Sequence, residues 1–290
     1  MKTMLKKNLV RMGFFGPGLF LLMPITGLKS PDNNSKETYV AGFHSGSLVD
    51  TAIADRMDSA ILMASTSTDL AKAPANVPAI QLNKHVVNFV KSYLVKEDEV
   101  LTLVKKRSKS YFPLFDTIFT HYNLPLELKY LAVVESDLQT NALSRVGAKG
   151  MWQLMPGTAR ELGLKITNKY DERTHAYRST VAAAKYLKDL YAEFGDWLLV
   201  IAAYNGGPGT VYKAIKRSGS RNFWALQNFL PEESRGHVKR FISTHYYFEG
   251  KGSFTTMTKA ETIAYVKVLE TLKESKDAEV ADSTNTVVSR

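Results

Sequence analysis

Apolar residues recur at helical spacing along most of the chain from about residue 81, whereas alternation with a period of two is scarce. Two runs show this spacing: Val86, Phe89, Val90, Tyr93 and Leu94, and later Leu114, Phe115, Ile118 and Phe119. Pro125 can occupy the first turn of a further helix. Ser179 can cap another helix that ends at Gly195, and Asp196 can cap the next one. The pattern therefore predicts a mainly α domain.

Both ends of the chain depart from this pattern. Residues 1–28 have a basic start and then an apolar stretch, Phe14 to Ile25, which resembles a secretory signal peptide. That stretch is short for a bilayer span, so an uncleaved anchor is the weaker alternative. Residues 29–80 are rich in Ser, Thr, Asp, Asn and Ala, which predicts a disordered spacer. Residues 256–290 form a polar tail, with a short helix expected over 260–272 and an unstructured end, and residues 81–255 remain for the folded domain.

One acidic residue lies where the helical pattern predicts an apolar one. Glu135 falls within the stripe formed by Leu128, Leu131, Ala132 and Leu138, whereas Asp137 lies on the other face and is expected to be solvated. Burial disfavours the charged form of a carboxyl group and raises its pKa, which suits a general acid. A structural Glu paired with an Arg or a backbone amide fits this helix equally well.

Two loops carry further candidate side chains. Trp152 and Gln153 follow a loop with two glycines, and together they offer a flat apolar face and an amide that donates and accepts, as a sugar site needs. Tyr204 and Asn205 end an apolar helix at a glycine-rich turn, where side chains commonly face a cleft. A packed Trp and ordinary helix capping explain the same residues without function.

Charge and cysteine content narrow the classes of function. The 38 Lys and Arg residues exceed the 28 Asp and Glu residues by 10, which suits a polyanionic partner such as nucleic acid, an anionic membrane or a cell-wall polymer. No block of basic residues interleaved with aromatics favours nucleic acid. The absence of cysteine excludes disulfides, thiolate metal sites, a Cys nucleophile and lipid attachment to an N-terminal Cys.

Taken together, the motifs between residues 124 and 248 resemble those of lytic murein transglycosylases. They are Val134-Glu135-Ser136, the run from Gly147 to Ala159 that contains Met-Trp-Gln, Asp171-Glu-Arg173, Ser179-Thr-Val-Ala-Ala, Ala202-Ala-Tyr204-Asn205-Gly-Gly and Glu233-Ser-Arg-Gly-His-Val238. These stand in the order and at about the spacing of the soluble-lytic-transglycosylase (SLT) branch of the lysozyme-like superfamily, glycoside hydrolase family 23. The likeness is strongest to the membrane-bound lytic transglycosylase D type, although LysM repeats, which such proteins often carry, are not found in this sequence.

The resemblance implies a lysozyme-like helical domain with a glycan-binding cleft. It implies that Glu135 is the catalytic acid and base, that Ser144, Gln153, Met155, Tyr204 and Asn205 line the cleft, and that Glu233 contacts substrate. Three positions depart from the family pattern: Lys149 replaces a small residue, His175 an Asp and His237 a Tyr. Their roles stay open.

The resemblance also implies the reaction. A lytic transglycosylase would break the β-1,4 bond between N-acetylmuramic acid (MurNAc) and N-acetylglucosamine (GlcNAc) in peptidoglycan and form 1,6-anhydromuramoyl ends. One carboxylate suffices because the C6 hydroxyl of MurNAc attacks its own C1 with a large effective concentration. A lysozyme-type hydrolase and a non-catalytic wall-binding module are the alternatives, and nucleic-acid binding is a weaker one. The sequence predicts no metal or cofactor, since His85, His121 and His245 lack metal-ligand spacing. It also predicts export to the periplasm or cell envelope of a Gram-negative-type bacterium, with peripheral association with the envelope as a further possibility.

Overall fold

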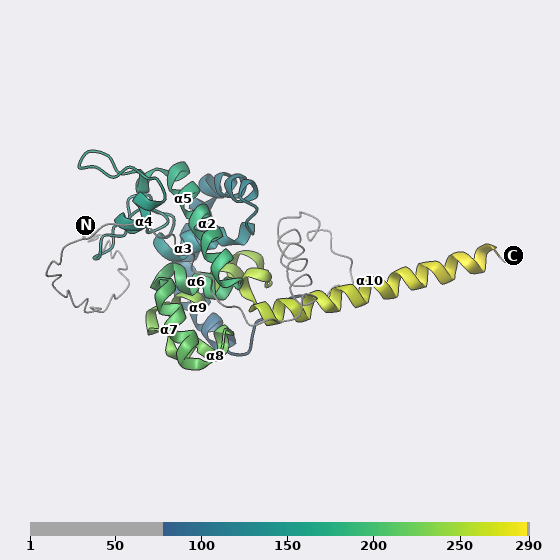
Figure 1. Ribbon diagram of the computed structural model, residues 1–290. Coiled ribbons are helices and arrows are strands. Elements are labelled where there is room, and N and C mark those ends of the chain that lie inside the picture. Colours follow the sequence, from purple (N-terminus) through teal and green to yellow (C-terminus); the bar gives the residue numbers. More distant parts are fainter. Residues whose placement is uncertain (1–77, 289–290) are drawn as a thin grey trace, which may run out of the picture. The chain divides into compact units, whose positions relative to one another are not determined.

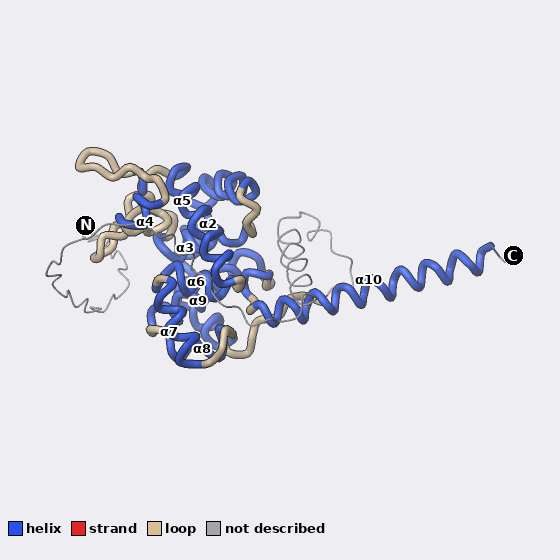
Figure 2. Tube along the Cα trace, in the orientation of Figure 1, coloured by secondary structure: helices blue, strands red, loops and turns tan. Residues whose placement is uncertain are grey.

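The computed structural model describes residues 78–288, and within this range the ordered elements are helices (Figures 1 and 2). In place of strands this part of the chain has three isolated antiparallel bridges, in the loops between residues 143 and 171. The mainly α prediction is therefore confirmed. The longer helices are α2 (Val87–His121), α5 (Ala176–Phe194), α6 (Trp197–Gly206), α7 (Pro208–Ser218), α9 (Glu232–Glu249) and α10 (Lys259–Val288), and the shorter ones are α3 (Tyr130–Ser136), α4 (Pro156–Glu161) and α8 (Phe223–Leu226).

The core is built around α6, in which every residue from 197 to 203 is buried. A helix that is apolar on all sides is stable only when neighbours cover it completely. Helices α5, α7 and α9 pack against α6, and α2 packs against both α5 and α9, so α6 lies inside the bundle (Figure 1). Both apolar runs predicted near the start of the domain lie on α2, apart from Val86, which immediately precedes it, and α2 continues through Pro113.

Helix α3, which carries Glu135, is shorter than the sequence pattern predicts. Pro125 precedes a 3-10 turn, Leu126–Lys129, and α3 follows it and ends at Ser136. Asp137 and Leu138 then adopt left-handed backbone conformations, with φ of 52° and 61°. Leu138 is buried as expected, but it packs from beyond the helix and is not part of a helical stripe. Asp137 is half-buried, so the prediction of a solvated side chain was only partly right.

Two predicted caps had different outcomes. Asp196 caps α6 as expected, since its Oδ1 accepts hydrogen bonds from the backbone N–H groups of Leu198 and Leu199. Ser179 does not cap α5, because the helix begins a turn earlier after His175. The Ser179 hydroxyl is buried and donates to the carbonyl of His175, the alternative bond that serine side chains form inside helices.

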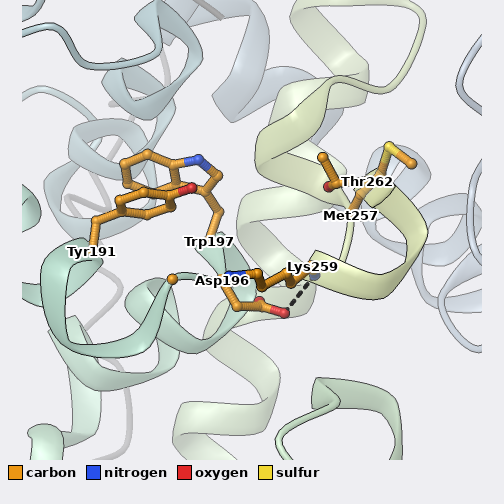
Figure 3. Close-up of a pocket in the computed structure, with 7 residues that line it drawn as sticks. Tyr191, Asp196, Trp197, Met257, Lys259 and Thr262 are labelled. Carbon is orange, nitrogen blue, oxygen red and sulfur yellow. Dashed lines mark hydrogen bonds between the residues drawn. The ribbon is translucent and has the colours of Figure 1, made fainter. Parts of the chain in front are cut away.

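The second oxygen of Asp196 connects α6 to the start of α10. Its Oδ2 accepts the backbone N–H of Lys259 at 2.7 Å, beside the stacked rings of Tyr191 and Trp197 (Figure 3). The domain therefore extends past residue 255, with Thr262 still buried. The helix predicted over 260–272 is present, but α10 continues to residue 288, so the predicted short length and unstructured end are wrong. No Gly or Pro interrupts that stretch.

The predicted export segment, residues 1–28, lies outside the described residues, as does nearly all of the predicted spacer. Between residues 78 and 288, no helix combines the length and the apolar character that a membrane crossing needs.

Candidate active site

Glu135 lies on α3 with its side chain only 13% exposed. The pKa of its carboxyl is raised to about 8, mainly by burial; the charge of Arg240 lowers it and the charge of Glu233 adds a smaller increase. Glu135 is therefore mostly protonated at neutral pH. The sequence left open a structural Glu in an ion pair, but such a pair would lower the pKa. A buried carboxyl that keeps its proton at neutral pH has the property that a general acid needs.

Helix α9 supplies three polar groups to Glu135 from one face. Glu233, His237 and Arg240 stand at spacings of four and three residues, and α9 packs directly on α3. The closest contact joins His237 Nε2 and Glu135 Oε1 at 3.3 Å. Burial, with the charge of Arg240, lowers the pKa of His237 to about 3, so the imidazole is neutral and the contact is not an ion pair.

Tyr204 approaches Glu135 from the end of α6. Burial raises the pKa of its hydroxyl well above the ordinary value, and the charge of Glu135 adds to that effect. The hydroxyl donates to the carbonyl of Trp152 at 2.7 Å. Because this bond occupies its hydrogen, the phenol oxygen can present lone pairs to a developing positive charge.

Asn205, next to Tyr204, connects α6 to the first turn of α9. Its Oδ1 accepts the hydroxyl of Ser234 at 2.9 Å, and its side chain also hydrogen-bonds Glu233. Burial raises the pKa of Glu233, whereas the bond from Asn205 and the charge of Arg240 lower it. The three predicted residues Tyr204, Asn205 and Glu233 therefore share a region with Glu135.

The loop between α3 and α4 holds the other predicted residues. Gln153 has a left-handed backbone, with φ of 45°, and its amide donates to the carbonyls of Ala142 and Gly150. Ser144 Oγ accepts the N–H of Ala148, and Met155 is 43% exposed just before α4. In this structure Ser144 and Gln153 stabilise the loop, and their predicted contacts with substrate stay predictions.

Buried polar contacts fix this loop against the domain. Ser136 Oγ donates to the carbonyl of Met151 at 2.9 Å, which couples the loop to the helix of Glu135. Arg173 donates to the carbonyls of Gly147 and Leu154. A Cβ at Gly150 would lie 1.9 Å from the carbonyl oxygen of Arg173, and φ there is 84°, so only glycine fits.

Two of the three departures from the family pattern have structural roles. Lys149 forms an ion pair with Asp171 at 3.3 Å. The side-chain hydrogen bond from Arg173, assisted by the Lys149 contact, lowers the pKa of Asp171 to about 2. His175 caps α5 through a 3.4 Å contact from the backbone N–H of Arg178. Only His237 reaches Glu135.

Sequence reasoning missed His237 and Arg240 as site residues. Both could have been found from helical spacing, because positions 233, 237 and 240 share one face of α9. The role of Trp152 as the acceptor for Tyr204 had no sequence signal, since a backbone carbonyl makes that contact.

Two cavities lie away from Glu135. One, of about 10 Å³, adjoins Asp196 and is too small for a ligand (Figure 3). The other, of about 160 Å³, lies between residues 78–83 and the start of α10. The glycan-binding cleft therefore stays a prediction. Among the side chains that the structure describes, residues 78–277, no group of three or more His, Cys, Asp or Glu could hold a metal ion.

Comparison with known proteins places these residues in a family. The profile of the transglycosylase SLT domain matches residues 119–227, a range that includes Glu135, Gln153, Tyr204 and Asn205. Membrane-bound lytic murein transglycosylase D of Escherichia coli K12 is 36% identical over 168 residues, which are 55% of this chain and 37% of that protein. A putative tributyltin chloride resistance protein of an Alteromonas species is 36% identical over 174 residues, and this chain covers 84% of it.

Among solved structures, the 70 kDa soluble lytic transglycosylase of Escherichia coli aligns with a TM-score of 0.46 and 28% identity. The alignment covers 52% of this chain and 26% of that protein. The domain match, together with the relative of which this chain covers 84%, decides the assignment. The chain belongs to the transglycosylase SLT domain family.

Proposed function

We propose that the chain is a peptidoglycan lytic transglycosylase with Glu135 as its single general acid and base. It would cleave the β-1,4 bond between MurNAc and GlcNAc and leave 1,6-anhydromuramoyl ends. The observation that carries this proposal is the buried carboxyl of Glu135, whose pKa is raised to about 8 inside an SLT domain. The name of the Escherichia coli K12 relative, a lytic murein transglycosylase, supports the choice of substrate.

The reaction follows in two steps from the state of Glu135. Protonated Glu135 first donates its proton to the glycosidic oxygen, and the bond from that oxygen to C1 of MurNAc breaks. The C6 hydroxyl of MurNAc then attacks C1, and the Glu135 carboxylate accepts the hydroxyl proton. The phenol oxygen of Tyr204, whose hydrogen is donated to Trp152, stabilises the positive charge that develops on the sugar ring.

The remaining predicted residues act in binding. Asn205 and Glu233, joined by a hydrogen bond, provide an amide and a carboxylate for sugar hydroxyl and acetamido groups. Ser144, Gln153 and Met155 would border the glycan on the neighbouring loop. Peptidoglycan is the partner, and we propose that the chain is exported to the envelope, where this polymer lies.

Glu233 also supports one alternative. It is a second carboxylate whose charge raises the pKa of Glu135, so a two-carboxylate hydrolase is conceivable at this site. In that reaction Glu233 would activate water, and the products would be reducing sugars. In the transglycosylase reaction Glu233 only binds substrate.

Mass analysis of fragments released from purified sacculi in ¹⁸O-labelled water separates these reactions. The transglycosylase reaction gives anhydro ends, which are one water lighter and free of label, and Glu135→Gln abolishes them. Glu233→Gln should raise KM but keep the anhydro product. Labelled reducing ends from the wild type would establish the hydrolase, and equal loss of turnover in both variants would give Glu233 a catalytic role instead of a binding one. Full activity of Glu135→Gln would refute the assignment of the acid.

A further inference from the structure

The contact between His237 and Glu135 needs an explanation of its own. His237 Nε2 lies 3.3 Å from Glu135 Oε1, and their side chains are 2% and 13% exposed. Among residues 78–277, whose side chains the structure describes, Nε2 has no hydrogen-bond partner. A buried ring nitrogen without a partner is unfavourable, so the nearby carboxyl oxygen is the group that can satisfy it.

The charge state of the ring restricts what this contact can do. Burial lowers the pKa of His237 to about 3, so the imidazole is neutral and carries one ring hydrogen. If that hydrogen is on Nε2, it can donate to Oε1 whether Glu135 is protonated or ionised. The acid presents a carbonyl oxygen there, and the carboxylate presents an anionic oxygen. One tautomer therefore serves both steps of the reaction.

We propose that His237 is a positioning residue for Glu135, whose Nε2–H donates to Oε1 and keeps the transferable proton on Oε2. This inference rests on the proposed function and extends it. When Oε1 already accepts a hydrogen bond, a proton on that oxygen would face the ring N–H, so the acid carries its proton on Oε2. Oε2 then donates to the glycosidic oxygen and later accepts the proton of the C6 hydroxyl. The contact of 3.3 Å is long and poorly aligned for such a bond, but catalytic hydrogen bonds often tighten when substrate binds.

The other groups that face Glu135 do not replace this role. From α9, Glu233 and Arg240 act on it through their charges, and from α6 Tyr204 faces it. The Tyr204 hydroxyl donates to the Trp152 carbonyl. His237 is therefore the donor closest to Oε1 among the described residues.

Two variants of nearly equal length test the donor. In His237→Gln the amide Nε2 can occupy about the position of the ring Nε2, whereas His237→Met fills similar space without an N–H group. We expect kcat of the Met variant to fall about 10- to 100-fold with little change in KM, and the Gln variant to stay within about threefold of wild type. The Met variant also loses a bond that stabilises the carboxylate. The limb on which kcat/KM falls at high pH should therefore move to higher pH in that variant only.

A measurement on the full-length wild-type chain checks the tautomer without turnover. The ¹⁵N chemical shifts of the His237 ring should show Nε2 protonated and Nδ1 unprotonated between pH 6 and 7. Unprotonated Nε2 would overturn the proposal. So would wild-type kcat in the Met variant, or equal losses in both variants with no movement of the pH limb. If the wild type itself releases no anhydro ends, the proposed function fails. If the wild type releases them and both His237 variants keep its kcat and pH limb, only this inference fails.

Discussion

Replacing Glu135 with Gln should make the folded chain more stable at neutral pH, although it removes the proposed catalytic acid. The wild-type carboxyl is buried, and its pKa rises from an ordinary value of 4.5 to about 8 on folding. The folded state therefore holds a proton that the unfolded state releases between these two pH values. An amide of the same shape has no proton to lose, so it avoids this destabilisation.

The magnitude follows from proton linkage. Below pH 4.5 both states are protonated, and the group contributes no pH dependence. As pH rises from 4.5 to about 8, this group lowers the free energy of unfolding of the wild type by about 1.4 kcal/mol per pH unit. Relative to acid pH, Glu135 destabilises the fold by about 3 kcal/mol at pH 7 and by about 5 kcal/mol above pH 9, an order-of-magnitude result.

Urea unfolding of both proteins between pH 4 and 9 tests the reasoning. Every other titrating group is common to the two proteins, so its effect cancels in the difference between their free energies of unfolding. The Gln variant should gain stability over the wild type steadily from pH 5 to 8. Glu99→Gln, on the exposed face of α2, is the control for a carboxylate that remains in water. A difference between the Glu135 variant and wild type that does not grow with pH would refute the burial argument.

Three further predictions concern the loop, the α10 junction and the charge near the acid. Gly150→Ala should destabilise the fold by more than about 3 kcal/mol in thermal unfolding because its Cβ meets a carbonyl oxygen, whereas Gly147→Ala, with open space around it, should cost about 1 kcal/mol. Asp196→Ala leaves three backbone N–H groups without their acceptor and should cost about 3 kcal/mol in urea unfolding, with faster hydrogen exchange at the start of α10. Arg240→Gln removes the charge that lowers the pKa of Glu135, so the high-pH limb of kcat/KM should move to higher pH; an unmoved limb would contradict this.

The helical fold and the position of Glu135 could be predicted because both leave a local signal. Apolar spacing defined the helices, and Glu135 interrupted an apolar stripe that the structure shows to be buried. The ends of helices were harder to predict. Ser179 has the chemistry of a cap, but the helix begins after His175, and the preceding turn is fixed by Asp171, which forms an ion pair with Lys149 of the distant loop. Such choices depend on tertiary contacts, which a single sequence does not display.

The hydrogen bonds within the site were harder to predict from the sequence than the residues that form it. Gln153 was predicted to bind sugar, yet its amide hydrogens are donated to two carbonyls of its own loop. The sequence shows that an amide is present but not which acceptors lie around it. The same limit applies to Tyr204, whose partner is a main-chain carbonyl with no side-chain signature.

The charges around Glu135 show why the family pattern alone is insufficient. Arg240 is the one group on α9 that opposes the raised pKa of the acid, while Glu233 reinforces it. Both residues, and His237 with them, stand on α9, whose neighbouring face carries Val238 and Phe241 and is fully buried in the core. A change in how α9 packs would therefore alter both the distance from His237 to Glu135 and the charges that set its pKa. Core substitutions under α9 that keep the fold should accordingly shift the pH dependence of turnover, an effect that would not arise if Glu135 acted independently of this helix.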